Sequence, residues 1–331
     1  MKFVGRPVRA TLLGLVLALL LAACSEDIPA QRETPASSPS PPLALSPSRS
    51  DLPIRVAVTL PLFAEFAREI GGKNVEVFSL FPAGADPHNY ELTPEDIGRI
   101  PEADVFFVNG LGLDTAAQEL IEQNRKATAK VIPFGPNLPS PQAGLQGNVN
   151  LKADEAGDNL HLWLDPVSAR SYADLVADVF MIVDRVNEAF YRANLAAYGD
   201  SLSGLDDEIK TQVMGIPEKN RRIVTYHDSF IHFANRYGLK VAAFAVATPG
   251  ENPGPEDVDR LTRVIGEEGP PGVFGEAGFD NSVLERIAAE SGVQMCSLYS
   301  DIQDESVPTY IEMMRADLAE LVRCLGGEDG A

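Results

Sequence analysis

The sequence predicts an α/β protein of two lobes, each a mostly parallel sheet flanked by helices, bridged by one long rigid helix. From Ile54 onward, short β-branched or aromatic runs alternate with helical patterns, which is typical of parallel sheets covered by helices. A second set of such runs begins near Arg222, and a chain of 331 residues exceeds the size at which one core usually stops growing. Two lobes are therefore expected.

The expected strands form two groups of four. In the first group they are residues 54–58, 75–80, 104–108 and 130–134, separated by helical segments such as 61–72 and 115–126. In the second group they are residues 222–226, 239–245, 272–274 and 293–299. We place the first lobe at residues 53–165 and the second at 188–331.

Residues 166–187 are the predicted linking helix. Apolar side chains recur there at helical spacing from Tyr172 to Val186. Asp165 is a suitable N-cap and Pro166 a suitable first helical residue. A helix of about twenty residues spans ~30 Å, so we expect a stiff connection between the lobes.

The N-terminus predicts export. Residues 1–23 combine a basic start with a short apolar run, and Ala22-Ala23-Cys24 resembles the processing site of bacterial lipoproteins. We expect Cys24 to carry the lipid anchor; the alternative is an ordinary signal peptide with a chance cysteine. Residues 24–52 are rich in Ser and Pro and predict an extended tether. Either reading places the protein outside the cytoplasm, at the cell surface or in the periplasm.

The net charge of −21 limits the classes of partner. Removing residues 1–23 takes away three positive charges and no acidic group, so the mature chain is more acidic still. Nucleic acid is an implausible partner for such a surface, whereas metal cations are attracted to it. We expect a monomer.

Four side chains form the predicted metal site: His88, His161, His227 and Asp301. They follow one another at nearly even intervals, in loops beside expected strands. Taken singly, each of these residues is more simply interpreted as a turn or packing residue. Their equivalent positions nevertheless favour a common ion, because ligands bind at strand C-termini in open parallel sheets. Three imidazoles and a carboxylate suit Zn²⁺, while a bidentate Asp301 would admit Mn²⁺ or Fe²⁺. The lack of a nearby thiol disfavours Cu(I).

Four further residues near these segments need interpretation. His232 lies within a helical pattern and points away from His227, so we interpret it as a partly exposed structural histidine. Glu276 is expected to line the cleft or to orient a metal ligand. Cys296 and Cys324 form either one disulfide, as an oxidising compartment allows, or two separate buried thiols.

At these residues the chain resembles the TroA-like, metal-binding family of ABC-transporter substrate-binding lipoproteins, which deliver zinc or manganese. The similar segments, in order, are GADPHNYELTPEDIGRIPEADVFFVNGLGLD from Gly84, HLWLDP from His161, VTYHDSFIHFANRYGL from Val224, FGEAGFDNSVLERIAAESGV from Phe274, and SLYSD followed by PTYIEMMRADL. The resemblance implies that His88 and His161 come from the first lobe and His227 and Asp301 from the second. It also implies a membrane permease and its ATPase as partners.

The identity of the metal rests on two departures from the family pattern. Many zinc members carry a His-rich loop before the second histidine, and residues 135–160 contain no histidine. Many manganese members have Glu where this chain has His227. We give the ligand His227 more weight than the absence of a His-rich loop. We therefore favour zinc as the metal, with manganese next. Whether the polar loop 144–158 covers the site stays open.

Two other classes of function compete with metal transport. A zinc hydrolase is compatible with three protein ligands and an open position, but it needs a general base, for which Glu276 is the only candidate, and no HExxH is present. A surface adhesin or structural lipoprotein fits the anchor and tether equally well. Binding of an organic solute would call for an Arg- or aromatic-lined cleft, which these loops do not indicate. We expect a carrier and no enzyme.

Overall fold

The computed structural model describes residues 52–138, 159–247, 249–251, 253–302 and 306–326. The chain forms two compact units, residues 1–48 and 49–331, and all described residues belong to the second. The predicted signal segment 1–23, Cys24, residues 25–51 of the tether and the loop 144–158 lie outside the described residues. No helix in the described ranges is long and apolar enough to cross a membrane.

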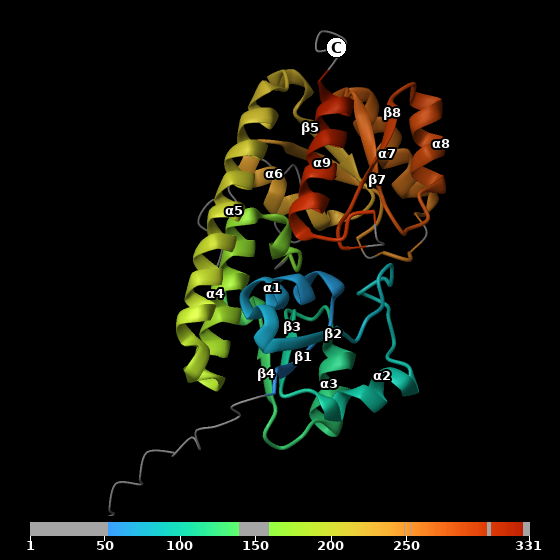
Figure 1. The fold of residues 1–331 in the computed structure, drawn as a ribbon. Helices are drawn as coiled ribbons and strands as arrows, with labels where there is room; N and C mark the ends of the chain where they lie inside the picture. The colour runs from blue at the N-terminus through green and yellow to red at the C-terminus, as the bar shows by residue number, and fades with distance from the viewer. Residues whose placement is uncertain (1–51, 139–158, 248, 252, 303–305, 327–331) are drawn as a thin grey trace, which may run out of the picture. The chain divides into compact units, whose positions relative to one another are not determined.

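The first lobe contains a parallel sheet of four strands in the order β2-β1-β3-β4 (Figure 1). The strands are β1 (Ile54–Val58), β2 (Val75–Ser79), β3 (Val105–Val108) and β4 (Lys130–Pro133). The helices of this lobe are α1 (Pro61–Gly71), α2 (Pro94–Arg99) and α3 (Thr115–Asn124). β3 is buried along its whole length, as expected of a strand covered on both faces.

The second lobe repeats the same topology with the order β6-β5-β7-β8. Its strands are β5 (Arg222–Thr225), β6 (Lys240–Phe244), β7 (Gly272–Glu276) and β8 (Gln294–Leu298). Its helices are α6 (Ile231–Tyr237), α7 (Pro255–Glu268), α8 (Ser282–Ser291) and α9 (Tyr310–Leu325). The predicted two-lobed α/β architecture is confirmed; the strand ends differ from prediction by one or two residues.

Both sheets have a point at which the strand order reverses. In the first lobe it lies between β1 and β3, and in the second between β5 and β7. The C-terminal ends of strands at such a point border a crevice in which open α/β sheets bind ligands. The residues after β5 and at the end of β7 are therefore expected to border a binding site in the second lobe.

The linking helix differs from the prediction. α4 (Pro166–Val183) begins as expected, with the Asp165 side chain accepting from the Val167 N–H, but it ends at Val183 and does not reach residue 187. The chain turns at Asp184, and the helix that contacts both α1 and α9 is α5 (Glu188–Gly215), 28 residues long. The predicted end of the helix was wrong because Val186 continues the apolar spacing, although it lies in the turn and is 82% exposed.

One hydrophobic core extends through both lobes. It runs from β1 and β3 through α4 and α5 to α9, and aromatic rings make direct contact across it, such as Phe66 of α1 and Tyr310 of α9 with centroids 5.5 Å apart. A smaller core fills the side of the second sheet covered by α7 and α8. Because the lobes share buried apolar surface along α5, they are joined stiffly.

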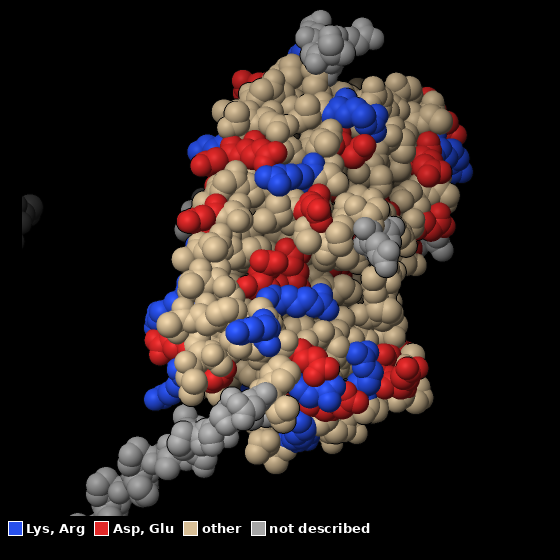
Figure 2. Space-filling view, in the orientation of Figure 1, with Lys and Arg blue, Asp and Glu red and all other residues tan. Residues whose placement is uncertain are grey.

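The outer surface carries charges of both signs. In Figure 2, Lys and Arg side chains are interspersed with Asp and Glu, and the described part of this face has no broad basic patch. Several of the charges are paired, for example Arg236 with Asp206 at 2.6 Å and Lys240 with Glu268 at 2.7 Å.

Glu65 is a buried carboxyl group that connects α1 with the other elements of the shared core. It is 7% exposed, accepts a hydrogen bond from the Tyr198 hydroxyl of α5 at 3.2 Å, and accepts another from the backbone N–H of Tyr310. Tyr310 is the first residue of α9, so Glu65 satisfies a free N–H at the start of a helix in the other lobe. Burial raises the pKa of Glu65 from 4.5 to about 7, against the lowering effect of these hydrogen bonds.

We expect Glu65→Gln to reduce the dependence of stability on pH. Because the folded-state pKa is raised, Glu65 contributes stability that is complete below about pH 4.5 and lost as the pH rises through about 7. The unfolding free energy of the wild type minus that of Glu65→Gln should therefore fall by about 2 kcal/mol from pH 5 to pH 8. Denaturant unfolding of metal-free protein measures it, with the exposed Glu119→Gln as control. A constant difference over this range contradicts the prediction.

Candidate metal centre

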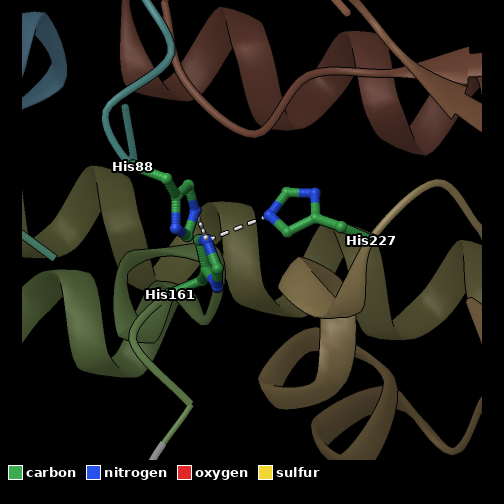
Figure 3. Close-up of side chains that lie close together, drawn as sticks. All are labelled: His88, His161 and His227. Atoms are coloured by element: carbon green, nitrogen blue, oxygen red, sulfur yellow. Dashed lines mark hydrogen bonds between the residues drawn. The ribbon is translucent and has the colours of Figure 1, made fainter. Parts of the chain in front are cut away.

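Three imidazole rings meet between the lobes (Figure 3). His161 Nε2 lies 3.2 Å from His88 Nε2 and 3.1 Å from His227 Nε2. One ring nitrogen from each histidine lies within 4.8 Å of the other two. The structure thus brings together three of the four predicted ligands, from positions far apart in the sequence.

Each histidine is placed by its own local structure. His88 lies in the turn after β2, and its backbone N–H donates to Asp86 Oδ1 at 2.9 Å. His161 immediately precedes a short 3₁₀ turn, Leu162–Leu164, that leads into α4. His227 follows the end of β5, at the point where the strand order of the second sheet reverses.

Hydrogen bonds behind the rings fix which nitrogen faces the centre. His161 Nδ1 lies 3.2 Å from Asn159 Oδ1, and His227 Nδ1 lies 2.5 Å from Glu276 Oε1. Because both partners are acceptors, we assign the ring protons to Nδ1, which leaves the Nε2 lone pairs pointing inward. Two lone pairs facing each other at 3.1 Å are unfavourable unless a cation lies between them.

The spacing of the nitrogens fits a small dication. Nitrogens bound to one tetrahedral zinc ion at about 2.0–2.1 Å lie roughly 3.3–3.4 Å apart. The two measured Nε2 separations, 3.2 Å and 3.1 Å, are close to this value. The two separations are therefore compatible with a shared zinc ion.

Burial keeps two of the ligands neutral. Desolvation, together with the neighbouring His227, lowers the pKa of His88 to about 4, and the same two causes lower the pKa of His161 well below its usual range. For His227, burial acts in the same direction, but the charge and hydrogen bond of Glu276 outweigh it and raise the pKa. Neutral imidazole is the form that binds metal.

Glu276 is the carboxylate that acts most strongly on His227. It is fully buried at the end of β7, and Oε1 also accepts hydrogen bonds from the His227 N–H at 3.2 Å and the Ser229 hydroxyl at 3.1 Å. Oε2 is buried without a hydrogen-bond partner among the described residues. A buried carboxylate with a free oxygen is costly unless positive charge lies nearby, and an ion held by His227 would supply it.

Asp301 does not join the three rings. It is 4% exposed, but its carboxylate is not among the groups whose ligand atoms lie within 4.8 Å of one another. It instead accepts hydrogen bonds from the backbone N–H groups of Ile302, at 2.7 Å, and Leu62. Leu62 lies in the first turn of α1, which has no side-chain cap of its own, so Asp301 caps that helix from the other lobe.

Sequence reasoning missed two residues that support the site. Asn159 holds His161 and also donates from Nδ2 to the Asp228 carbonyl of the second lobe at 2.8 Å. Asp114 accepts from the Thr59 hydroxyl at 2.7 Å and the Asn109 N–H at 2.6 Å, which organises the loops after β1 and β3. Asn159 lies two residues before a predicted ligand, a position from which an Asx side chain commonly reaches the backbone. No comparable sequence pattern indicates the role of Asp114.

Two other interpretations can be compared with the structure. His232 was expected to be partly exposed, but it is 5% exposed, and its Nε2 lies 3.1 Å from the Asn159 carbonyl oxygen. The error arose because α6 packs against the segment that carries His161, a contact that helical spacing does not reveal. Cys296 of β8 and Cys324 of α9 are joined as a disulfide.

Comparisons with known proteins show which family the chain resembles. The family described as "Zinc-uptake complex component A periplasmic" matches residues 56–324. The manganese-binding lipoprotein MntA of Halalkalibacterium halodurans is 27% identical over 274 residues, which cover 81% of this chain and 87% of that protein. The manganese ABC transporter substrate-binding lipoprotein PsaA of Streptococcus pneumoniae is 28% identical over 327 residues, covering 96% and 98%.

The fold also has solved counterparts. The structure of the periplasmic zinc-binding protein TroA from Treponema pallidum matches with a TM-score of 0.74 at 23% identity, over 83% of this chain and 99% of that one. At this identity the match supports the fold alone, and the sequence comparison supports the family. The chain therefore belongs to the zinc-uptake component A family of metal-binding, substrate-binding proteins of ABC transporters, which are transport components and not enzymes.

Proposed function

We propose that this protein captures zinc at the centre formed by His88, His161 and His227 and delivers it to a membrane permease driven by an ATPase. The convergence of the three Nε2 atoms carries this proposal, since each histidine is oriented or positioned by its own hydrogen bonds. Buried imidazoles at this spacing suit zinc better than manganese, which prefers oxygen ligands. The names of MntA and PsaA keep manganese as the second candidate. Fe²⁺ is a third, because a bidentate Asp301 would admit it.

We propose Asp301 as the fourth ligand, which requires its carboxylate to turn toward the rings. Its backbone partners Ile302 and Leu62 leave carboxylate lone pairs that are not needed for those hydrogen bonds. A water molecule is the alternative fourth ligand. If Asp301 binds the ion, Asp301→Asn should weaken zinc binding, because the amide keeps an acceptor for the helix cap but loses the charge.

The preference for zinc is tested by comparing two dissociation constants. Zinc binds most sites more tightly than manganese, so simple preference is not diagnostic. The test compares Glu276→Gln with the double variant His227→Glu, Glu276→Gln, because the glutamine avoids two adjacent acids. The quantity compared is the ratio of the manganese to the zinc dissociation constant, which should fall in the double variant. We expect a fall of about tenfold or more, since a carboxylate suits manganese better than an imidazole does. An unchanged ratio, or manganese outcompeting zinc in the wild type, contradicts the proposal.

We also propose that the mature protein is a monomer tethered to the outer side of the membrane through acylated Cys24. The support is the sequence around Cys24 and the lipoprotein names of the relatives. Labelled fatty acid should enter the wild-type protein and not Cys24→Ser, and the variant should be released from membranes. Incorporation of label into the variant would contradict this assignment.

Glu276→Gln should weaken zinc binding by about 10- to 100-fold, the usual cost of removing a group that orients a metal-bound histidine. The glutamine amide cannot supply the negative charge that makes His227 a stronger metal ligand. Competition with a chromogenic chelator measures the affinity, and circular dichroism checks that the fold is retained. Glu268→Gln, at a surface ion pair of the same lobe, is the matched control. Equal affinity in wild type and Glu276→Gln would remove Glu276 from the site.

A further inference from the structure

A polar connection joins the two lobes beside the three histidines. Asn89 Nδ2 donates to the carbonyl oxygen of Pro249, in the second lobe, at 2.8 Å. The same amide group donates to Asp86 Oδ2 at 2.7 Å. We call the chain of contacts from Asp86 through Asn89 to Pro249 the polar clip.

The polar clip is attached to a metal ligand at its first end. Asp86 accepts from Asn89 with one oxygen and from the backbone N–H of His88 with the other, at 2.9 Å. A displacement of the Asn89 amide is therefore transmitted through one carboxylate to the backbone that carries the His88 ring.

The other end of the polar clip lies near Tyr226, the residue before His227. The Gly250 N–H is 3.5 Å from the Tyr226 hydroxyl, and the Tyr226 ring stacks on Phe279 with centroids 5.4 Å apart. Gly250 has φ +81°, and a Cβ added there would lie 3.1 Å from Asn89 Nδ2. Any other residue would be strained by this backbone conformation, and its Cβ would crowd the Asn89 amide.

Solvent reaches the three rings from the side of His88. His161 and His227 are 2% and 1% exposed, whereas His88 is only half-buried. Among these three histidines, His88 is therefore the one most accessible to an ion arriving from solvent. The polar clip holds the His88 turn against the second lobe.

We propose that Asn89 is a positioning residue that controls the rate of metal exchange, and that breaking its hydrogen bond to the Pro249 carbonyl is the opening step for entry and release of the ion. This inference rests on the proposed function. Since this is one part-buried hydrogen bond between neutral groups, its loss should accelerate exchange by about 3- to 10-fold. The ligands themselves remain in place.

The test compares Asn89→Ala with wild type by stopped flow. Zinc-loaded protein is mixed with excess chelator to give the release rate, and metal-free protein is mixed with zinc to give the entry rate. Both rates should rise about 3- to 10-fold in the variant, while the stoichiometry of one zinc per chain stays the same. Gly250→Ala, which crowds the clip from the other side, should also accelerate both rates.

Asn137→Ala is the matched control, because exposed Asn137 also donates from Nδ2 to a proline carbonyl, that of Pro133 at 2.7 Å, but within the first lobe. Its exchange rates should equal those of wild type. A purely structural role for Asn89 would weaken binding without accelerating entry. Wild-type rates in Asn89→Ala, or equal acceleration in the control, overturn the inference. Failure of wild type to bind any zinc would instead overturn the proposed function.

Discussion

Replacing His161 with alanine should abolish high-affinity zinc binding. His161 is the central ring of the three, with Nε2 within 3.2 Å of both others, and its removal leaves two imidazoles that no longer surround an ion. The loss should exceed the 10- to 100-fold typical of changes behind a metal ligand, so we expect more than about 100-fold. Isothermal titration of chelator-stripped protein, with competition for the wild type, measures it.

His232→Ala is the appropriate control for that experiment. His232 is also a buried histidine in contact with the His161 segment, through the Asn159 carbonyl, but it is not one of the three clustered rings. Its variant should keep one zinc ion per chain and lose far less affinity than His161→Ala. If His161→Ala binds zinc as tightly as His232→Ala does, the three-histidine centre is not the zinc site.

Removing the disulfide should give the largest loss of stability. Cys296 and Cys324 are separated by 28 residues, and closing a loop of that length in the unfolded chain corresponds to about 3.5 kcal/mol. We expect the Cys296→Ser, Cys324→Ser double variant to lose about that much unfolding free energy. The bond pins the end of α9 to β8, remote from the three rings, so zinc stoichiometry should not change.

Reductant provides the internal control for the disulfide. It should lower the stability of the wild type to that of the double variant and leave the variant unaffected, as measured by denaturant unfolding of metal-free protein. If reductant lowers both equally, or the double variant is as stable as the oxidised wild type, the bond does not stabilise the protein as calculated.

The strands and the three histidines could be predicted from the sequence because both depend on local patterns. Buried strands of a parallel sheet are short apolar runs between helical segments, and ligand-bearing loops follow their ends. Thus β1 was predicted to the residue, and His227 was placed directly after the predicted strand 222–226, which in the structure ends at Thr225. The end of α4 was not predictable in this way, because Val186 continues the apolar period into a turn.

Contacts between distant segments were the part that the sequence did not reveal. Asn89 and Pro249, or Glu65 and Tyr310, meet only because the lobes share a core, and no periodicity links them. Asp301 illustrates the same limit. Its position after β8 suggests a ligand, but the structure gives its carboxylate the free N–H of Leu62 in α1 as a partner, a contact that no sequence pattern indicates.

The most direct test is the anomalous scattering of zinc-loaded crystals measured at the zinc absorption edge. We predict one strong peak about 2.0–2.1 Å from Nε2 of His88, His161 and His227. A strongest peak at any other group, or no peak at the three rings in protein that carries one zinc ion per chain, would contradict the account.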